Sequence, residues 1–210
     1  MHQDHAPHHP TTAAEWDERY SGDAVWSGNP NQALVDEARH LPVGRALDIG
    51  CGEGADSVWL ASRGWQVTSL DISARAVERT LTAAQDAGVA VAGLAAAFAD
   101  ARLPDESFDL VSAMYPVLPA DDGAALDKLL GLVAAGGHLL FVHHAGMEGH
   151  DAAQAVELLF PADVAAAVRK RDGWELVTDE LRDRNVSTGQ GAHHAQDVVV
   201  HARRLQSPQE

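Results

Sequence analysis

The stretch that decides the fold is Leu47-Asp48-Ile49-Gly50-Cys51-Gly52-Glu53-Gly54. Its apolar start, residues 45–50, predicts a buried strand, and residues 52–63 predict the helix that follows the strand. Glycines between the end of a strand and the start of a helix let a ligand approach the backbone closely. The stretch therefore predicts a ligand-binding turn at the edge of a parallel sheet.

Outward from this turn, short apolar runs alternate with helical stretches, which is the pattern of an α/β protein with crossover helices. We expect strands over 45–50, 66–72, 90–99, 108–114, 139–144, 174–179 and 197–202. Further helices are expected over 78–85 after an N-cap at Ser73, over 126–133 with an end at Gly136-Gly137, and from Pro161. No crossover helix fits between the last two strands, so we expect that pair to be antiparallel.

Composition limits the classes of function. The chain has 210 residues, 46% of them hydrophobic, which suits one domain, expected over 13–210. The formal net charge of −16 disfavours nucleic acid and anionic membranes as partners and favours a small molecule. No apolar run is long enough to span a membrane. The one cysteine, Cys51, rules out an internal disulfide and suits the cytoplasm. Residues 1–12 carry four histidines and little apolar content, so we expect a disordered tail.

Charge distinguishes two ligands that the glycine turn could hold. Gly50, Gly52 and Ala55 also satisfy the loose dinucleotide pattern, which makes the turn ambiguous by itself. Three carboxylates, those of Asp48, Glu53 and Asp56, bracket the place where a dinucleotide puts its pyrophosphate. They would repel that group, whereas S-adenosylmethionine carries no phosphate and brings a sulfonium and an ammonium group. The charges favour S-adenosylmethionine over a nicotinamide dinucleotide.

Two acids after later strands fit a nucleoside. Asp71 ends the second strand about 20 residues after the first glycine, where an acidic side chain can take both ribose hydroxyls of either ligand. Asp100 closes the third strand, where its carboxylate can accept from an adenine amino group. The alternative for that aspartate is a helix cap.

With these residues together, the chain resembles the class I methyltransferases. Within that family it is most similar to the group containing thiopurine S-methyltransferase and the tellurite-resistance methyltransferases. The resemblance is carried by residues 47–54, 70–73, 98–100, 108–111 and 136–140, with 16–20 and Trp26. It implies a Rossmann-like three-layer sandwich, with a seven-stranded, mostly parallel sheet whose last strand is antiparallel. It also implies S-adenosylmethionine as the cofactor.

The resemblance also implies roles by position. Residues 13–40 would cover the cofactor, with Trp16, Tyr20 and Trp26 in the lid, although these aromatics could simply staple a helix to the core. Asp48 would lie near the donor's amino group, and Met114 and Tyr115 would face its methyl group. The remaining implied cofactor residues are Gly50, Gly52 and Gly54 in the loop, Asp71 on the ribose, Ile72 on the adenine face, and Asp100 with the Ala101 amide on the adenine edge. Prolines at 116 and 119 depart from the family, whose members often continue into helix there.

The implied reaction is methyl transfer by in-line displacement to a small-molecule acceptor: a thiol, another soft nucleophile, a hydroxyl or an amine. A base is needed only if the acceptor arrives protonated, and Tyr115, His143 and His144 are its candidates. Further histidines, His150 and the pair His193-His194, follow in the sequence. No pair of these histidines has the close helical spacing of a metal motif, so no metal is expected. A nicotinamide-dependent oxidoreductase and a non-catalytic S-adenosylmethionine-binding protein remain the alternatives.

Overall fold

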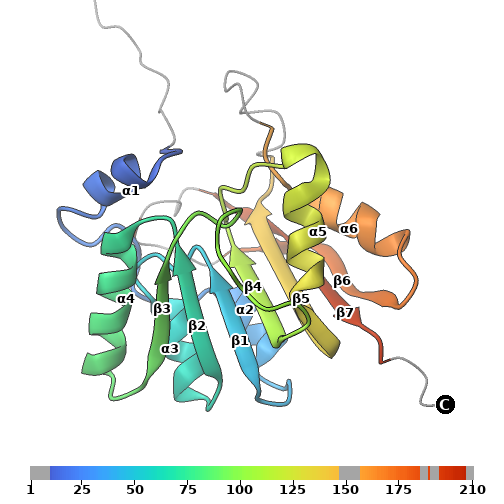
Figure 1. Ribbon diagram of the computed structural model, residues 1–210, viewed down its shortest axis with the longest axis horizontal. Helices are drawn as coiled ribbons and strands as arrows, with labels where there is room; N and C mark the ends of the chain where they lie inside the picture. Colours follow the sequence, from blue (N-terminus) through green and yellow to red (C-terminus); the bar gives the residue numbers. More distant parts are fainter. Residues whose placement is uncertain (1–9, 147–156, 185–188, 190–193, 207–210) are drawn as a thin grey trace, which may run out of the picture.

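The centre of the computed structural model, which describes residues 10–146, 157–184, 189 and 194–206, is a seven-stranded sheet in the order β3-β2-β1-β4-β5-β7-β6 (Figure 1). The strands from β1 to β5 pair in parallel, and β7 pairs antiparallel with both β5 and β6. This confirms the predicted Rossmann-like α/β sandwich. The strands are β1 (Arg45–Ile49), β2 (Gln66–Asp71), β3 (Val91–Ala95), β4 (Phe108–Met114), β5 (Val133–His144), β6 (Trp174–Asp183) and β7 (Gln196–Arg204).

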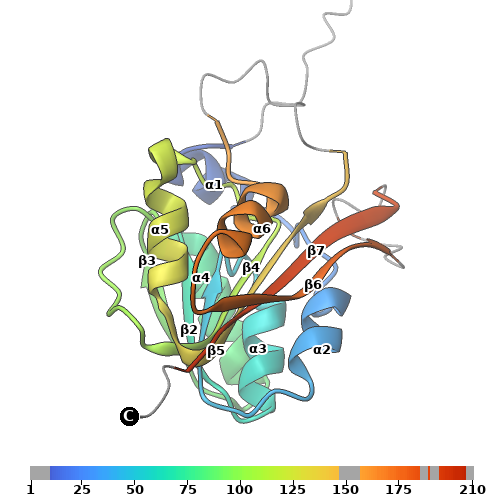
Figure 2. The same ribbon diagram turned by 90° about the vertical axis from the view of Figure 1, so that its right-hand side faces the viewer.

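Helices cover both faces of the sheet. They are α1 (Ala13–Arg19), α2 (Gln32–Ala38), α3 (Ala55–Ser62), α4 (Ala74–Asp86), α5 (Ala124–Gly131) and α6 (Pro161–Arg169), with a short 3₁₀ turn at Asp121–Gly123. Buried side chains of α5 and α6 form one core with the sheet, and those of α2 and α3 form a second core on its other face (Figure 2). Among the described residues, no helix is long and apolar enough to cross a bilayer.

The strand order indicates where a ligand crevice is expected. The chain runs outward from β1 to β2 and β3, then returns to lay β4 on the other side of β1. Ligands of open α/β sheets bind at the carboxyl ends of the strands where the order reverses in this way. The carboxyl ends of β1 and β4 therefore mark the candidate site, and α1 lies above this edge in Figure 1.

Ser73 and Pro161 begin helices as predicted. The Ser73 hydroxyl accepts from the Ala76 amide, 3.1 Å away, so α4 starts directly after this cap. Pro161 occupies the first turn of α6, whose Val164 and Val168 are buried. Residues 1–9 of the expected tail lie outside the described residues, while Thr12 forms a capping box with Glu15 at the start of α1.

The predicted helix end at Gly136-Gly137 is wrong. Helix α5 ends at Gly131, and Val133 already pairs with Phe108, so both glycines lie within β5. A Cβ on Gly137 would meet three backbone carbonyl oxygens at 2.9–3.1 Å, which explains why a glycine stands there. The glycine marks a close approach of backbone at an irregular strand pairing, not a helix terminus.

The boundaries of other elements also differ from the prediction. Helix α3 begins at Ala55 instead of 52, because Gly52 and Gly54 have φ angles of 53° and 89°. Strand β3 is limited to Val91–Ala95, since the alanine-rich 96–99 forms a turn. Strands β6 and β7 extend beyond the predicted 174–179 and 197–202 and pair antiparallel as expected.

Glu37 joins α2 to the last two strands. Its carboxylate lies 2.8 Å from Nδ1 of the buried His201 and accepts a hydrogen bond of 2.7 Å from Arg182. The hydrogen bond with His201, with help from Arg182, holds the pKa of Glu37 at about 2, below its usual 4.5. The charged form of Glu37 is therefore the form that stabilises the fold.

We expect the contribution of Glu37 to stability to be complete above pH 4.5 and to be lost as the pH falls from 4.5 to about 2. The folded state binds this proton less readily than the unfolded state, so acid favours unfolding. Urea unfolding of the wild type and Glu37→Gln checks this: the difference in their unfolding free energies should be large at pH 7 and shrink towards pH 2. A difference that stays constant with pH would contradict the assignment.

Candidate functional site

Two glycines of the turn differ in their surroundings: Gly50 faces open space, and Gly54 packs against α4. Gly50, Gly52 and Gly54 all have positive φ angles, and the amides of Gly50 and Cys51 donate to the Leu70 carbonyl at the end of β2. A Cβ on Gly50 would meet nothing within 4 Å, whereas one on Gly54 would lie 2.8 Å from the Thr80 Cα. Gly50 thus faces open space at the end of β1, and Gly54 lets α4 pack against the turn.

Asp71 joins the turn to the end of β2. One carboxylate oxygen accepts from the Gly52 amide at 3.0 Å and the other from the Ser73 amide at 2.9 Å. The side chain is 7% exposed, and burial raises its pKa. Each oxygen keeps a further lone pair, so the carboxylate can still accept from a ligand hydroxyl.

The three acids around the turn are all held by groups of the protein. Asp48 is buried and accepts from the Ser57 hydroxyl at 2.6 Å, and burial, followed by the charge of Asp56, raises its pKa. Asp56 accepts from the amide and the side chain of Asn31, and Glu53 is paired with Arg79. Burial raises the pKa of Asp56 as well. The position of Asp48 near a donor's amino group stays a prediction.

Residues 13–31, here called the cover, contact the turn through aromatic side chains. The Tyr20 hydroxyl accepts from the Trp26 indole N–H at 3.0 Å, and the rings of Trp16 and Tyr20 stack with centroids 5.8 Å apart. A Cβ on Gly52 would lie 3.1 Å from Trp26 Nε1 and 3.2 Å from the Tyr20 hydroxyl. The aromatic group therefore lies directly on the glycine turn.

On the side where an adenine is expected, the structure leaves Ile72 half-buried and Asp100 exposed. The Ala101 amide, predicted to read the adenine edge, donates to the Ala97 carbonyl at 3.0 Å. A residue that the sequence analysis missed, Lys128 of α5, donates to the carbonyls of Phe98, Ala99 and Ala101. Lys128 therefore holds the backbone of residues 98–101 in place through these three hydrogen bonds.

Beyond β4, three polar side chains meet at one aspartate. Asp197, buried at the start of β7, accepts from the Tyr115 hydroxyl at 2.7 Å and lies 3.0 Å from both Arg184 Nε and His144 Nδ1. The His144 ring stacks on Tyr115 at 4.2 Å and on His194 at 3.9 Å. The structure thus brings Tyr115 and His144 together through Asp197, which the sequence analysis did not single out. Asp197 reaches this place because β7 pairs antiparallel with β5, a pairing that the sequence did not predict.

His143 also lies beside this group, with its ring centroid 6.4 Å from that of Tyr115 and 6.0 Å from that of His144. Met114 is buried at the end of β4, and His143 is buried with its ring 5.2 Å from that of Phe160. His150 and His193 lie outside the described residues. Within the part of the chain that the structure describes, no group of three or more histidine, cysteine or acidic side chains could hold a metal ion.

Burial, followed by the negative charge of Asp197, raises the pKa of Tyr115 above its usual range. Tyr115 is therefore a hydrogen-bond donor at neutral pH and a poor proton acceptor.

We expect Tyr115→Phe to lower the free energy of unfolding by about 2 kcal/mol, since its hydroxyl donates to a charged group. Tyr20→Phe is a matched control, because its hydroxyl accepts from a neutral group, the Trp26 indole. We expect this variant to lose about 1 kcal/mol of unfolding free energy. Urea unfolding of both variants measures the two losses. A larger loss for Tyr20→Phe would contradict the reading of the Asp197 contacts.

Comparisons with known proteins agree with this geometry. Residues 46–137 match the family model described as a methyltransferase domain. An uncharacterized methyltransferase of Mycobacterium tuberculosis is 36% identical over 124 residues, which are 57% of this chain and 61% of that protein. A ubiquinone biosynthesis O-methyltransferase of Ralstonia nicotianae is 36% identical over 100 residues, 46% of this chain and 42% of that protein. The match to the family model runs from β1 into β5 and so contains the glycine turn, Asp71 and Met114.

The fold has solved relatives. The structure of the N-methyltransferase NodS from Bradyrhizobium japonicum, in complex with S-adenosylhomocysteine, superposes with a TM-score of 0.69 at 19% identity. The superposition covers 94% of this chain and 98% of that one, so the likeness of fold extends over the whole sheet. The chain itself spans 61% of the length of the mycobacterial relative that it matches.

Proposed function

We propose that this chain, whose residues 46–137 match a methyltransferase domain, moves a methyl group from S-adenosylmethionine to a small-molecule acceptor. The observation that carries the proposal is the open space over Gly50, at the point of the sheet where the strand order reverses. Asp71 lies on one side of this point and Met114 on the other. A donor placed there would have its ribose beside Asp71 and its methyl group towards β4.

The residues present fit this donor. The Asp71 carboxylate would accept from the ribose hydroxyls, Ile72 would pack on the adenine, and Asp100 would lie at its edge. Gly50 leaves room for the amino-acid part of the donor, which a side chain would fill. When bound, the sulfonium supplies an already activated methyl group, so the chain's task is to hold the acceptor in line and exclude water.

The acceptor site would lie on the β4 and β5 side of the crevice. Tyr115 donates to Asp197 there, which leaves His143 and His144 as the groups able to take a proton from a hydroxyl acceptor. A thiolate or another soft nucleophile needs no base, and the resemblance to the thiopurine and tellurite-resistance group supports such an acceptor. The net charge of −16 supports a small molecule over a nucleic acid, and the single cysteine supports a reducing compartment such as the cytoplasm.

Methyl transfer itself is the test of the enzymatic part. The full chain is incubated with S-adenosylmethionine and a panel of small thiols, phenols, alcohols and amines, and the products are analysed by mass. The proposal expects one class of acceptor to gain a methyl group with equal formation of S-adenosylhomocysteine. Binding of the donor without transfer to any class would instead favour a non-catalytic binding protein.

A further inference from the structure

Hydrogen bonds attach the cover to the rest of the protein near its start, in its middle and at its end. Near its start, one Asp17 oxygen accepts from the Ser73 hydroxyl at 2.6 Å and from the Arg75 amide at 3.2 Å. At its end, the Asn31 amide and side chain each donate to Asp56 at 2.7 Å. The middle, residues 22–26, is held by Glu53 of the glycine turn and Arg79 of α4.

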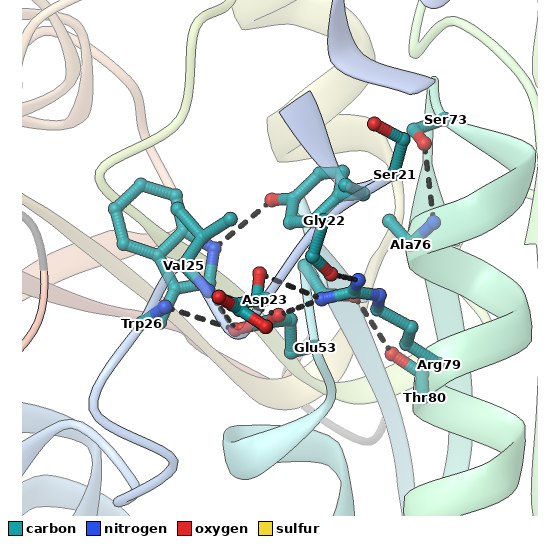
Figure 3. Close-up of polar contacts among 12 residues, drawn as sticks. Ser21, Gly22, Asp23, Val25, Trp26, Glu53, Ser73, Ala76, Arg79 and Thr80 are labelled. Atoms are coloured by element: carbon teal, nitrogen blue, oxygen red, sulfur yellow. Dashed lines mark hydrogen bonds and ion pairs between the residues drawn. The ribbon is translucent and has the colours of Figure 1, made fainter. Parts of the chain in front are cut away.

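In the middle of the cover, the oppositely charged side chains of Glu53 and Arg79 both hydrogen-bond to backbone groups, as Figure 3 shows. Glu53 accepts from the amides of Val25 at 3.1 Å and Trp26 at 2.9 Å, and it forms an ion pair with Arg79. Arg79 also donates to the carbonyl of Gly22, and its distance to the carbonyl of Asp23 is 3.4 Å. Arg79 therefore holds the start of the segment 22–26, and Glu53 holds its end. We call these two residues the clamp.

The segment that the clamp holds lies over the glycine turn. Trp26 is both a backbone partner of Glu53 and the donor to the Tyr20 hydroxyl, and both side chains contact Gly52. The Gly52 amide in turn donates to Asp71. Residues 20–26 therefore lie on the turn through Gly52, whose amide binds Asp71.

We propose that Glu53 and Arg79 are positioning residues of the donor site, and that the donor enters and leaves only when the clamp opens. The proposal rests on the function proposed above, because it takes the glycine turn as the donor's site. The clamp touches the cover and the turn and acts on the donor through Tyr20 and Trp26.

This role has a kinetic signature. The clamp holds the cover whether or not a donor lies beneath it, so weakening it destabilises the free and the bound closed states equally. The cover then opens faster, so the donor both associates and dissociates faster. The equilibrium affinity for the donor stays nearly the same. A residue that merely stabilises the bound complex would change the dissociation rate and the affinity but not the association rate.

The test uses S-adenosylhomocysteine as the probe, mixed rapidly with the full chain while tryptophan fluorescence is followed. We expect Arg79→Gln to raise both the association and the dissociation rate constants at least fivefold, with the dissociation constant within about twofold of the wild type. Glu53→Gln should also raise both rate constants. In this variant the Val25 and Trp26 amides, which Glu53 binds, should exchange their hydrogens faster. Arg171→Gln, which removes a surface ion pair with Asp127, is the matched control and should change neither rate.

Unchanged rates in Arg79→Gln and Glu53→Gln, or a faster dissociation alone, would overturn the clamp while leaving the donor site standing. Failure of the wild type to bind S-adenosylhomocysteine would overturn the proposed function and the clamp with it. Urea unfolding of each variant shows whether it is folded. If one of Arg79→Gln and Glu53→Gln is not folded, the rates of the other decide the test.

Discussion

Gly54→Ala is expected to lower the free energy of unfolding by about 3 kcal/mol, by adding left-handed backbone strain to overpacking. Gly54 has a φ angle of 89°, and the added methyl group would lie 2.8 Å from the Thr80 Cα and 2.9 Å from its Oγ1. The neighbour is the backbone of α4, which cannot move aside as the end of a flexible side chain can. Urea unfolding monitored by circular dichroism measures the loss.

Gly50→Ala separates the two causes. Gly50 has a similar φ angle of 75°, but its added methyl group meets nothing within 4 Å, so only the strain of about 1–2 kcal/mol remains. The same methyl group enters the space proposed for the donor, so this variant should lose S-adenosylhomocysteine affinity while it keeps most of its stability. Equal destabilisation by the two substitutions would contradict the assignment of Gly54 to packing.

Asp71→Asn is expected to weaken binding of S-adenosylhomocysteine by about 100-fold, because two hydrogen bonds from ribose hydroxyls to a charge are weakened together. The variant should also lose about 1–3 kcal/mol of stability, since an asparagine must turn its NH₂ towards the Gly52 or the Ser73 amide. The second effect follows from the structure and was absent from the sequence reading of Asp71. Titration calorimetry and urea unfolding give the two quantities.

Asp109→Asn provides the matched control. Asp109 also accepts from a backbone amide, that of Arg45, at 2.7 Å, but it lies at the amino end of β4, away from the crevice. Its substitution should cost stability without changing affinity. If Asp71→Asn and Asp109→Asn left the affinity equally unchanged, Asp71 would not hold a ribose.

The fold was readable from the sequence because its signals are local. The glycine turn, the Ser73 cap, the proline that begins α6 and the apolar runs each depend on residues close together in the chain. The Gly136-Gly137 pair was misread because the same residues serve a helix end and a tight strand approach. Only the pairing of Val133 with Phe108, 25 positions apart, distinguishes them.

The site was readable only in part, because its side-chain partners come from distant segments. The sequence analysis treated Glu53 and Asp56 as charges presented to a ligand, whereas Arg79 and Asn31 hold them. Likewise Asp197 meets Tyr115 through the antiparallel placement of β7, which no local pattern specifies. Spacing along the chain indicated which acids lie near the turn but not which donors hold them.

The most direct test of the account is calorimetric titration of the purified chain with S-adenosylhomocysteine, with reduced nicotinamide dinucleotides titrated in parallel. We expect S-adenosylhomocysteine to bind with a dissociation constant on the order of micromolar, a binding free energy of about −8 kcal/mol, and the dinucleotides to give no heat. Binding of a dinucleotide with no response to S-adenosylhomocysteine would contradict the donor assignment and leave only the Rossmann-like fold.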